Sequence, residues 1–264
     1  DHNKMKSMLE GSFAEINLVG ILHESGRASF EQAHHQLPRR LAQLCVDLGI
    51  DRLIHMSALQ ANKSAPSQYL RSKAAGESAV NEFSKKLNIT IFKPSIIFGR
   101  HDSFFNLFAR LVKLLPVIVL AKPDAKFQPI WVEDVTSCMV NALENTDTYG
   151  KTYELGGPQV YTFRELVQKV MTILGISRPI IGLSDKLSYL QGFAMEFLPV
   201  KLMSRDNVRS MRVDSITVQT LAPELGVSLM PLEAVVPEYL TNSTPRGAYD
   251  AFRSAAGRAI NAKR

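Results

Sequence analysis

The residues best placed for chemistry in this chain are Tyr69 and Lys73, with Ser57 twelve positions before the tyrosine. Positions four apart share one face of a helix, so the phenol and the amine are expected to point the same way. A free tyrosine has a pKa of about 10, and a neighbouring ammonium favours its phenolate by charge attraction. With a serine hydroxyl to hold a substrate oxygen, the three residues predict an acid/base device for reducing a carbonyl or oxidising an alcohol.

Each of these residues also has a purely structural explanation. A Tyr-x-x-x-Lys spacing arises by chance on exposed helix faces, and Ser57 could simply end a strand and cap a turn. The elements that position them are therefore part of the argument.

Strand and helix patterns alternate through the first hundred residues. Apolar runs at 15–20, 51–56 and 89–92 indicate strands, and residues 30–48 and 69–87 have the spacing of helices, the first kinked or split by Pro38. This order predicts a parallel sheet covered by helices, with ligands beyond the carboxyl ends of the strands. Gly20, Ser57 and the pair at 94–95 follow the three strands, so their chemistry is expected to converge on one crevice.

The second half predicts further helices. They are expected at residues 103–115, 133–144 and 184–198, and from the capping box of Thr162 and Glu165 to about Leu174.

Composition is that of a soluble globular protein, with 45% hydrophobic and 21% charged residues. The longest apolar runs, such as residues 114–121, are too short to cross a bilayer. Cys45 and Cys138 lie in helical patterns and are expected to be buried thiols, and the histidines have no metal-ligand spacing.

The net charge of +6 is concentrated at the C-terminus. Residues 246–264 hold five basic residues and one acid, which is +4 of the total. This distribution predicts no nucleic-acid-binding face. The tail could adsorb to a membrane surface, dock on an acidic partner, or remain a solvated end.

With Ser57, Tyr69, Lys73 and a Pro-x-x-x-Phe-Gly string at 94–99 in this order, the chain resembles the extended and atypical short-chain dehydrogenase/reductase superfamily. Four strings make it similar to the branch of the respiratory complex I accessory subunit and its bacterial relatives. They are INLVGILHESG (16–26), HMSALQAN (55–62), KPSIIFGRHDSFFN (93–106) and FQPIWVEDV (127–135). The resemblance covers most of residues 10–175.

The resemblance implies a nicotinamide dinucleotide, usually NADP(H) in this branch, although the sequence leaves NAD open. Tyr69 would be the acid/base, Lys73 would bind the nicotinamide ribose and lower the tyrosine pKa, and Ser57 would orient the reacting oxygen. The cofactor would contact two further groups of residues. These are Leu18, Val19 and Gly20 beside its ribose and phosphates, and Pro94, Ser95 and Ile97 beside the nicotinamide.

The fold class that follows is α/β, a Rossmann-like doubly wound parallel sheet with a small C-terminal α/β substrate lobe. We expect a nucleotide-binding domain at 1–175 that contains some lobe segments, the lobe at 176–244 and a basic tail at 245–264. The glycine-rich first turn of the superfamily is missing. We therefore expect the first roughly 60 residues of a typical member to be absent from this chain.

Two functions remain open at this point. The first is an NAD(P)-dependent oxidoreductase or epimerase/dehydratase that acts on an unidentified small carbonyl, alcohol or sugar nucleotide. The second is a non-catalytic, dinucleotide-binding accessory or assembly subunit of a respiratory NADH dehydrogenase, docked through the basic tail on that complex or on a membrane surface. Either would act in a bacterial cytoplasm or a mitochondrial matrix, as a soluble protein that could be peripheral to the inner membrane.

Overall fold

Four parallel strands form the central sheet of the computed structural model, which describes residues 2–26, 28–197 and 202–241. The strand order is β1-β2-β3-β8, and each neighbouring pair runs in the same direction. The strands are β1 (Ala14–Asn17), β2 (Arg52–Met56), β3 (Asn88–Pro94) and β8 (Thr152–Leu155). The predicted α/β class with a parallel sheet is confirmed.

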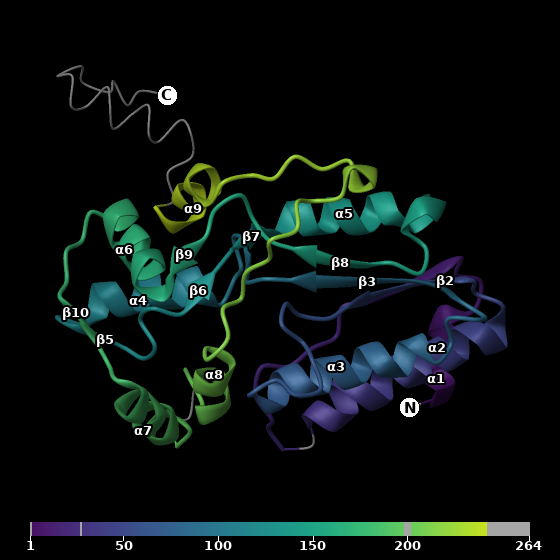
Figure 1. Ribbon diagram of the computed structural model, residues 1–264, viewed down its shortest axis with the longest axis horizontal. Helices are drawn as coiled ribbons and strands as arrows, with labels where there is room; N and C mark the ends of the chain where they lie inside the picture. The colour runs from purple at the N-terminus through teal and green to yellow at the C-terminus, as the bar shows by residue number, and fades with distance from the viewer. Residues whose placement is uncertain (1, 27, 198–201, 242–264) are drawn as a thin grey trace, which may run out of the picture.

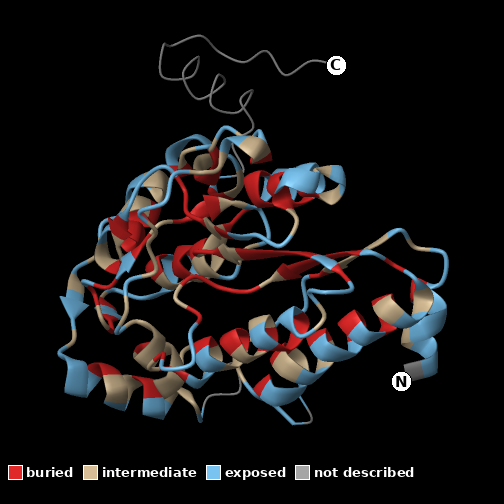
Figure 2. Cartoon of the chain, turned by 45° about the vertical axis from the view of Figure 1, so that its right-hand side comes forward, coloured by how far each residue is buried: buried red, intermediate tan, exposed pale blue. Residues whose placement is uncertain are grey.

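Helices cover both faces of this sheet (Figure 1). One face carries α1 (His2–Leu9), α2 (Leu37–Leu48) and α3 (Gln68–Asn81), and the other carries α5 (Val132–Glu144). Each face has its own apolar cluster, with Leu44 and Leu53 in one and Phe92 and Leu155 in the other. Figure 2 shows buried residues along the strands and on the inner sides of the helices.

The helix expected at 30–48 forms in two parts. Residues Glu31–Gln36 are a π-helix, η1, which continues directly into α2. Pro38 has no N–H to donate to the carbonyl of His34, so the regular α-helical bond cannot form at that point. Gly49 ends the helix as predicted, with a φ of 70°.

Helix α3 begins one residue before Tyr69 and ends at Asn81, six residues earlier than expected. The remaining residues to Leu87 form tight turns, in which Phe83 bonds Val80 and Lys86 bonds Phe83 three residues back. Asn88 then starts β3 rather than only closing the helix.

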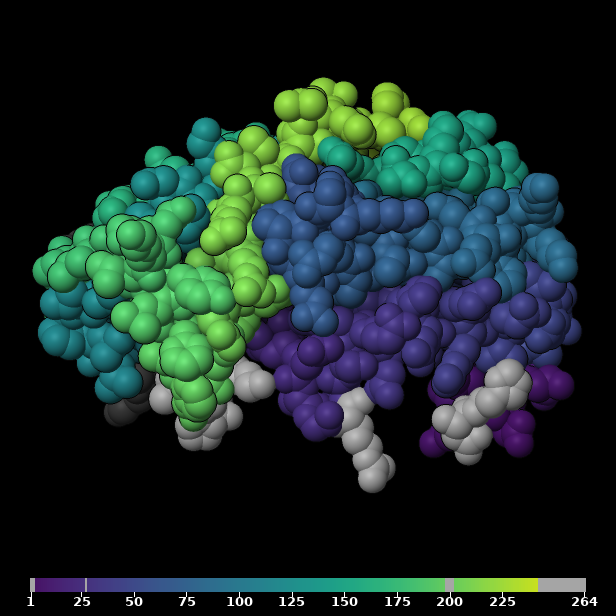
Figure 3. Space-filling model, turned by 60° about the horizontal axis from the view of Figure 1, so that its bottom comes forward, coloured from purple at the N-terminus to yellow at the C-terminus, as the bar shows by residue number. Residues whose placement is uncertain are grey.

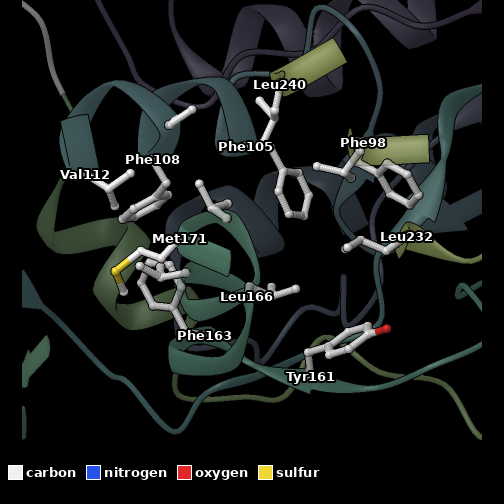
Figure 4. Packing of buried hydrophobic residues seen from close by; sticks show 14 of the residues in the cluster. Phe98, Phe105, Phe108, Val112, Tyr161, Phe163, Leu166, Met171, Leu232 and Leu240 are labelled. Atoms are coloured by element: carbon white, nitrogen blue, oxygen red, sulfur yellow. The ribbon is translucent and has the colours of Figure 1, made fainter. Parts of the chain in front are cut away.

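The other half of the molecule is built around the largest apolar cluster (Figure 4). The cluster packs α4 (Phe104–Leu114) and α6 (Phe163–Leu174) against α9 (Leu232–Leu240). The capping box of Thr162 and Glu165 at the start of α6 is confirmed. Because the cluster contains residues from 98 to 240, the division at residue 175 stays a prediction.

Short strand pairs complete this half. They are β4 (Ile97–Phe98) with β7 (Ile130–Trp131), β5 (Ile118–Leu120) with β10 (Ile180–Gly182), and β6 (Lys126–Phe127) with β9 (Tyr161–Thr162). Single-turn 3-10 helices lie at η2 (Thr146–Thr148) and η3 (Pro223–Leu225).

Helices α7 (Asp185–Met195) and α8 (Arg205–Ser210) pack on each other, and α8 also contacts α3. In Figure 3 the green segment that contains them lies against the purple and blue surface of the N-terminal half. The C-terminal part of the chain therefore reaches back to the helix that carries Tyr69. The predicted basic tail at 245–264 lies outside the described residues.

Both cysteines are free and buried, as predicted. None of the described helices combines the length and the apolar character that crossing a membrane requires. Strand β1 is the edge of the sheet, and Phe13, Leu18, Val19 and Leu22 beside it are exposed.

Candidate functional site

Lys73 is the residue of the predicted trio whose surroundings are most unusual. Its side chain is 5% exposed, and its ammonium donates one hydrogen bond among the described residues, to the carbonyl of Met56 at the end of β2 (3.0 Å). Burial lowers the pKa of Lys73 from 10.5 to about 8, against an opposing effect of the Glu77 carboxylate. The amine is thus a desolvated cation with donors left for a ligand.

Gly20 makes the space next to this amine. A Cβ atom built on Gly20 would lie 3.2 Å from Lys73 Nζ and 3.6 Å from His34 Nε2. A side chain there would crowd the ammonium, so the glycine lets the loop after β1 approach the lysine closely. Leu18 and Val19 in the same loop are exposed, and the amide of Val19 is held by the Asn17 side chain.

Ser57 follows β2 and is 3% exposed, with its amide bonded to Phe92 on the neighbouring strand. Its hydroxyl donates a short hydrogen bond to the carboxylate of Glu77 on α3. Glu77 in turn pairs with Lys93 at 3.1 Å, and Lys93 also donates to the carbonyl of Ala61. The Ser57 hydroxyl is therefore part of a hydrogen-bonded network with Glu77 and Lys93.

Tyr69 lies in the first turn of α3, which the C-terminal half caps. The Asp206 carboxylate accepts hydrogen bonds from the amides of Gln68 (2.8 Å) and Tyr69 (2.9 Å). The tyrosine ring packs edge-on against His34 and Phe30, with centroids 5.6 and 6.1 Å apart. The backbone and the ring of Tyr69 are therefore both contacted by residues outside α3.

The lowered pKa expected for Tyr69 is not found in the structure of the chain by itself. Burial raises the pKa of Tyr69 to about 12, whereas the resemblance implied that Lys73 lowers it. The ammonium of Lys73 instead bonds the Met56 carbonyl. The expected charge attraction is outweighed here by desolvation of the phenolate. The acid/base role of Tyr69 stays a prediction.

His34, in the π-helix η1, connects the parts of the site. Its Nε2 accepts a hydrogen bond from the amide of Ile21 (3.0 Å), and its Nδ1 is 2.7 Å from Ser72 Oγ. Because the Ser72 hydroxyl donates to the Tyr69 carbonyl, the network assigns the proton of His34 to Nδ1. Burial, with a contribution from Lys73, lowers the pKa of His34 to about 4, so the ring is neutral.

Pro94 ends β3, and Ser95 connects that end to the C-terminal half. The Pro94 carbonyl accepts a hydrogen bond from the amide of Leu59, in the loop after β2. The Ser95 hydroxyl donates to the carbonyl of Ser215 (2.7 Å) and accepts from the amide of Gln128.

Ile97 pairs with Ile130 and lines a pocket of about 580 Å³ beside Trp131 and Tyr239. This pocket does not include Ser57, Tyr69 or Lys73.

Sequence reasoning missed Glu77, His34 and Asp206. Glu77 had a usable signal, since it stands four residues after Lys73 and shares its helix face. The signal for His34 was weaker: Pro38, four positions later, interrupts the regular helical hydrogen bonding at His34. No sequence signal pointed to Asp206, because it accepts a hydrogen bond from Tyr69, a residue 137 positions away in the sequence.

Comparisons with known proteins show which proteins this chain is similar to. A family model described as "Male sterility protein", under the name NAD_binding_4, matches residues 20–122. Two curated relatives carry the name NADH dehydrogenase [ubiquinone] 1 alpha subcomplex subunit 9, mitochondrial. The protein from Arabidopsis thaliana is 31% identical over 89% of this chain, and the one from Mus musculus is 32% identical over 88%. The resemblance to the branch of the respiratory complex I accessory subunit, predicted from the sequence, is confirmed.

The chain spans 60% and 62% of the length of these two relatives. Among solved structures, MoeE5 in complex with UDP-glucuronic acid and NAD matches with a TM-score of 0.69 at 15% identity. That match covers 95% of this chain and 84% of the other, and at this identity it supports the fold alone.

Proposed function

We propose that this chain binds a nicotinamide dinucleotide above the carboxyl ends of β1 and β2 and serves as an accessory subunit of a respiratory NADH dehydrogenase complex. The observation that carries the binding site is the buried ammonium of Lys73 beside Gly20. Donors left on Lys73 suit ribose hydroxyls, and the close approach at Gly20 suits a ligand backbone lying against the loop. When bound, the nicotinamide would supply or accept a hydride.

The binding site is tested by titrating the chain with NADPH and NADH. We expect Lys73→Met to weaken binding by about tenfold or more, since it removes a charge-assisted donor worth roughly 1.5–3 kcal/mol. Gly20→Val should weaken binding as well, by crowding the amine. Lys86→Met, at an exposed lysine after α3, is the matched control.

The same titration compares the two dinucleotides. The resemblance favours NADP(H), while MoeE5 was solved with NAD. Absence of binding for both, or equal affinity of the Lys73 and Lys86 variants, would contradict the proposed site.

The accessory role rests on the names of the relatives and on the Ser57 network. A serine hydroxyl bonded to Glu77 stabilises the fold and is not free to orient a substrate oxygen. We expect the full chain to co-purify with a respiratory NADH dehydrogenase complex, on the matrix side in mitochondria or the cytoplasmic side in bacteria. Removal of residues 245–264 tests the tail, and no co-purification with or without it would count against this role.

A second candidate function is hydride transfer to a carbonyl or from an alcohol. It is favoured by Tyr69 and Lys73 on one face of α3. It requires that Tyr69→Phe abolish turnover while dinucleotide affinity stays nearly unchanged. If the wild-type chain binds the dinucleotide but turns over no carbonyl substrate, the accessory role is retained and this candidate is dropped.

A further inference from the structure

An open pocket of about 600 Å³ is lined by α6 and by the segment that leads into β10. These two elements lie at the end of the molecule away from β2 (Figure 1). Two arginines line it, Arg164 from the first turn of α6 and Arg178 from the loop before β10. Gln168, Thr172 and Ser177 add an amide and two hydroxyls, and the other three lining residues are apolar. None of the eight lining residues is acidic, so the pocket has a formal charge of +2.

Neither arginine has an ion-pair partner within the described part of the chain. The neighbouring acid Glu165 is bonded to the amide and hydroxyl of Thr162 instead. Asp185, which begins the next helix, pairs with Lys122. The positive charge of the pocket is therefore left for a ligand.

Among the residues that the structure describes, each guanidinium donates one long hydrogen bond. Arg164 Nη1 donates to the Ile180 carbonyl (3.4 Å), and Arg178 Nε donates to the Val112 carbonyl (3.3 Å). Gly182 makes room for the first of them, since a Cβ atom there would lie 2.6 Å from Arg164 Nη2. A guanidinium has five N–H donors, so most donors of both arginines remain for a ligand.

From this geometry we propose that the pocket binds an oxyanion, the phosphate or carboxylate group of a small molecule. Paired N–H donors of arginine match the two oxygens of such groups, which a single ammonium does not do. The Thr172 hydroxyl already donates to the carbonyl of Gln168 (3.0 Å), so the further donors are the Ser177 hydroxyl and the Gln168 side-chain amide. Met171, Ile176 and Ile180 form an apolar wall for the rest of the ligand. The site is independent of the dinucleotide site, because it shares no residue with it.

The test is calorimetric titration of the full chain with inorganic phosphate, phenyl phosphate and benzoate, at an ionic strength held constant with chloride. We expect saturable binding of phenyl phosphate, several times tighter than that of inorganic phosphate because of the apolar wall. Benzoate tests whether a carboxylate replaces the phosphate.

Variants then locate the binding. Arg164→Gln and Arg178→Gln should each weaken phenyl phosphate binding by about tenfold, and Arg178→Lys should also weaken it, because it keeps the charge but loses the paired donors. Arg212→Gln, at an exposed arginine outside the pocket, should leave it unchanged. Lys73→Met should also leave it unchanged.

Three results would overturn the proposal. They are the absence of saturable binding by the wild-type chain, equal weakening by Arg178→Gln and Arg212→Gln, and loss of binding in Lys73→Met, which would place the anion in the dinucleotide site. Lys73→Met distinguishes the two sites, because it is expected to weaken dinucleotide binding and to leave phenyl phosphate binding unchanged. Absence of phenyl phosphate binding would therefore not contradict the proposed function, and absence of dinucleotide binding would not contradict the oxyanion site.

Discussion

Two buried cations lie at opposite ends of strand β2, and their surroundings differ. Arg52, at the amino end, is 3% exposed, and its five N–H donors make six hydrogen-bond contacts with described residues, so one Nη2 hydrogen is shared between two acceptors. Its guanidinium lies 4.6 Å from the centroid of the Tyr149 ring. Two of its acceptors are the carbonyls of Ala142 and Leu143 in the last turn of α5, where the helix dipole is negative. Its donors are used up inside the protein.

Lys73, at the carboxyl end, is as deeply buried, but within the described part of the chain its ammonium donates one hydrogen bond, to the Met56 carbonyl. The contrast separates structure from function at the two edges of the sheet. A fully bonded buried cation stabilises the fold, whereas a sparsely bonded one costs stability and is retained where a ligand completes it. The carboxyl edge is also where parallel sheets place their ligands.

The largest expected effect concerns Arg52. Arg52→Met should lower the free energy of unfolding by about 3–5 kcal/mol, because the carbonyls and the Thr90 and Thr148 hydroxyls lose their buried donor. Urea denaturation measures the change. Arg39→Met, which breaks an exposed ion pair with Glu82, should cost less than about 1 kcal/mol. Equal losses in the two variants would break the comparison.

Lys73 should show the opposite behaviour. Its pKa is lowered from 10.5 to about 8, so the unfolded chain binds the proton more tightly and wild-type stability rises as pH increases from about 8 to about 10.5. Lys73→Met removes this penalty. Relative to the variant, the wild type should gain about 2–3 kcal/mol between pH 7 and pH 10. Denaturation at both pH values, with Lys86→Met as the control, measures it, and parallel pH curves would contradict it.

His34 sharpens the same contrast on the acid side. Burial lowers its pKa from 6.5 to about 4, so the unfolded chain takes up the proton first and stability falls as pH drops through this range. Between pH 7 and pH 5 the wild type should lose about 2 kcal/mol more than His34→Gln. Urea denaturation at the two pH values measures the difference, and equal losses in the wild type and in His34→Gln would contradict it.

Asp206 gives the smallest effect and tests the link between the two halves. Asp206→Ala should cost about 1 kcal/mol, as expected for loss of a helix N-terminal cap. Amide exchange should speed up at Gln68 and Tyr69, which lose their acceptor, but not at Leu70, which Ser67 caps. Unchanged exchange at Tyr69 would show that the first turn of α3 does not depend on the C-terminal half.

Much of the fold could be predicted from local patterns. The apolar runs identified β1, β2 and β3 to within a few residues, and the capping box located the start of α6. The pair of β5 and β10 was missed, because three-residue strands have too little alternation to distinguish them from loops. The early end of α3 at Asn81 was missed for a related reason, since the residues that follow have ordinary helix-forming types.

For the candidate site, the sequence alone determined that Tyr69 and Lys73 share a face of one helix and that Gly20 and Ser57 follow two strands of one sheet. These are consequences of the helical repeat and of strand order, which depend on residues close together in the chain. Only the tertiary structure decided the partners of each group: the Ser57 hydroxyl with Glu77, the Lys73 amine with the Met56 carbonyl, and the amide of Tyr69 with Asp206. Those contacts depend on how separate elements pack, and burial, which sets the pKa values of Tyr69, Lys73 and His34, exists only after that packing has formed.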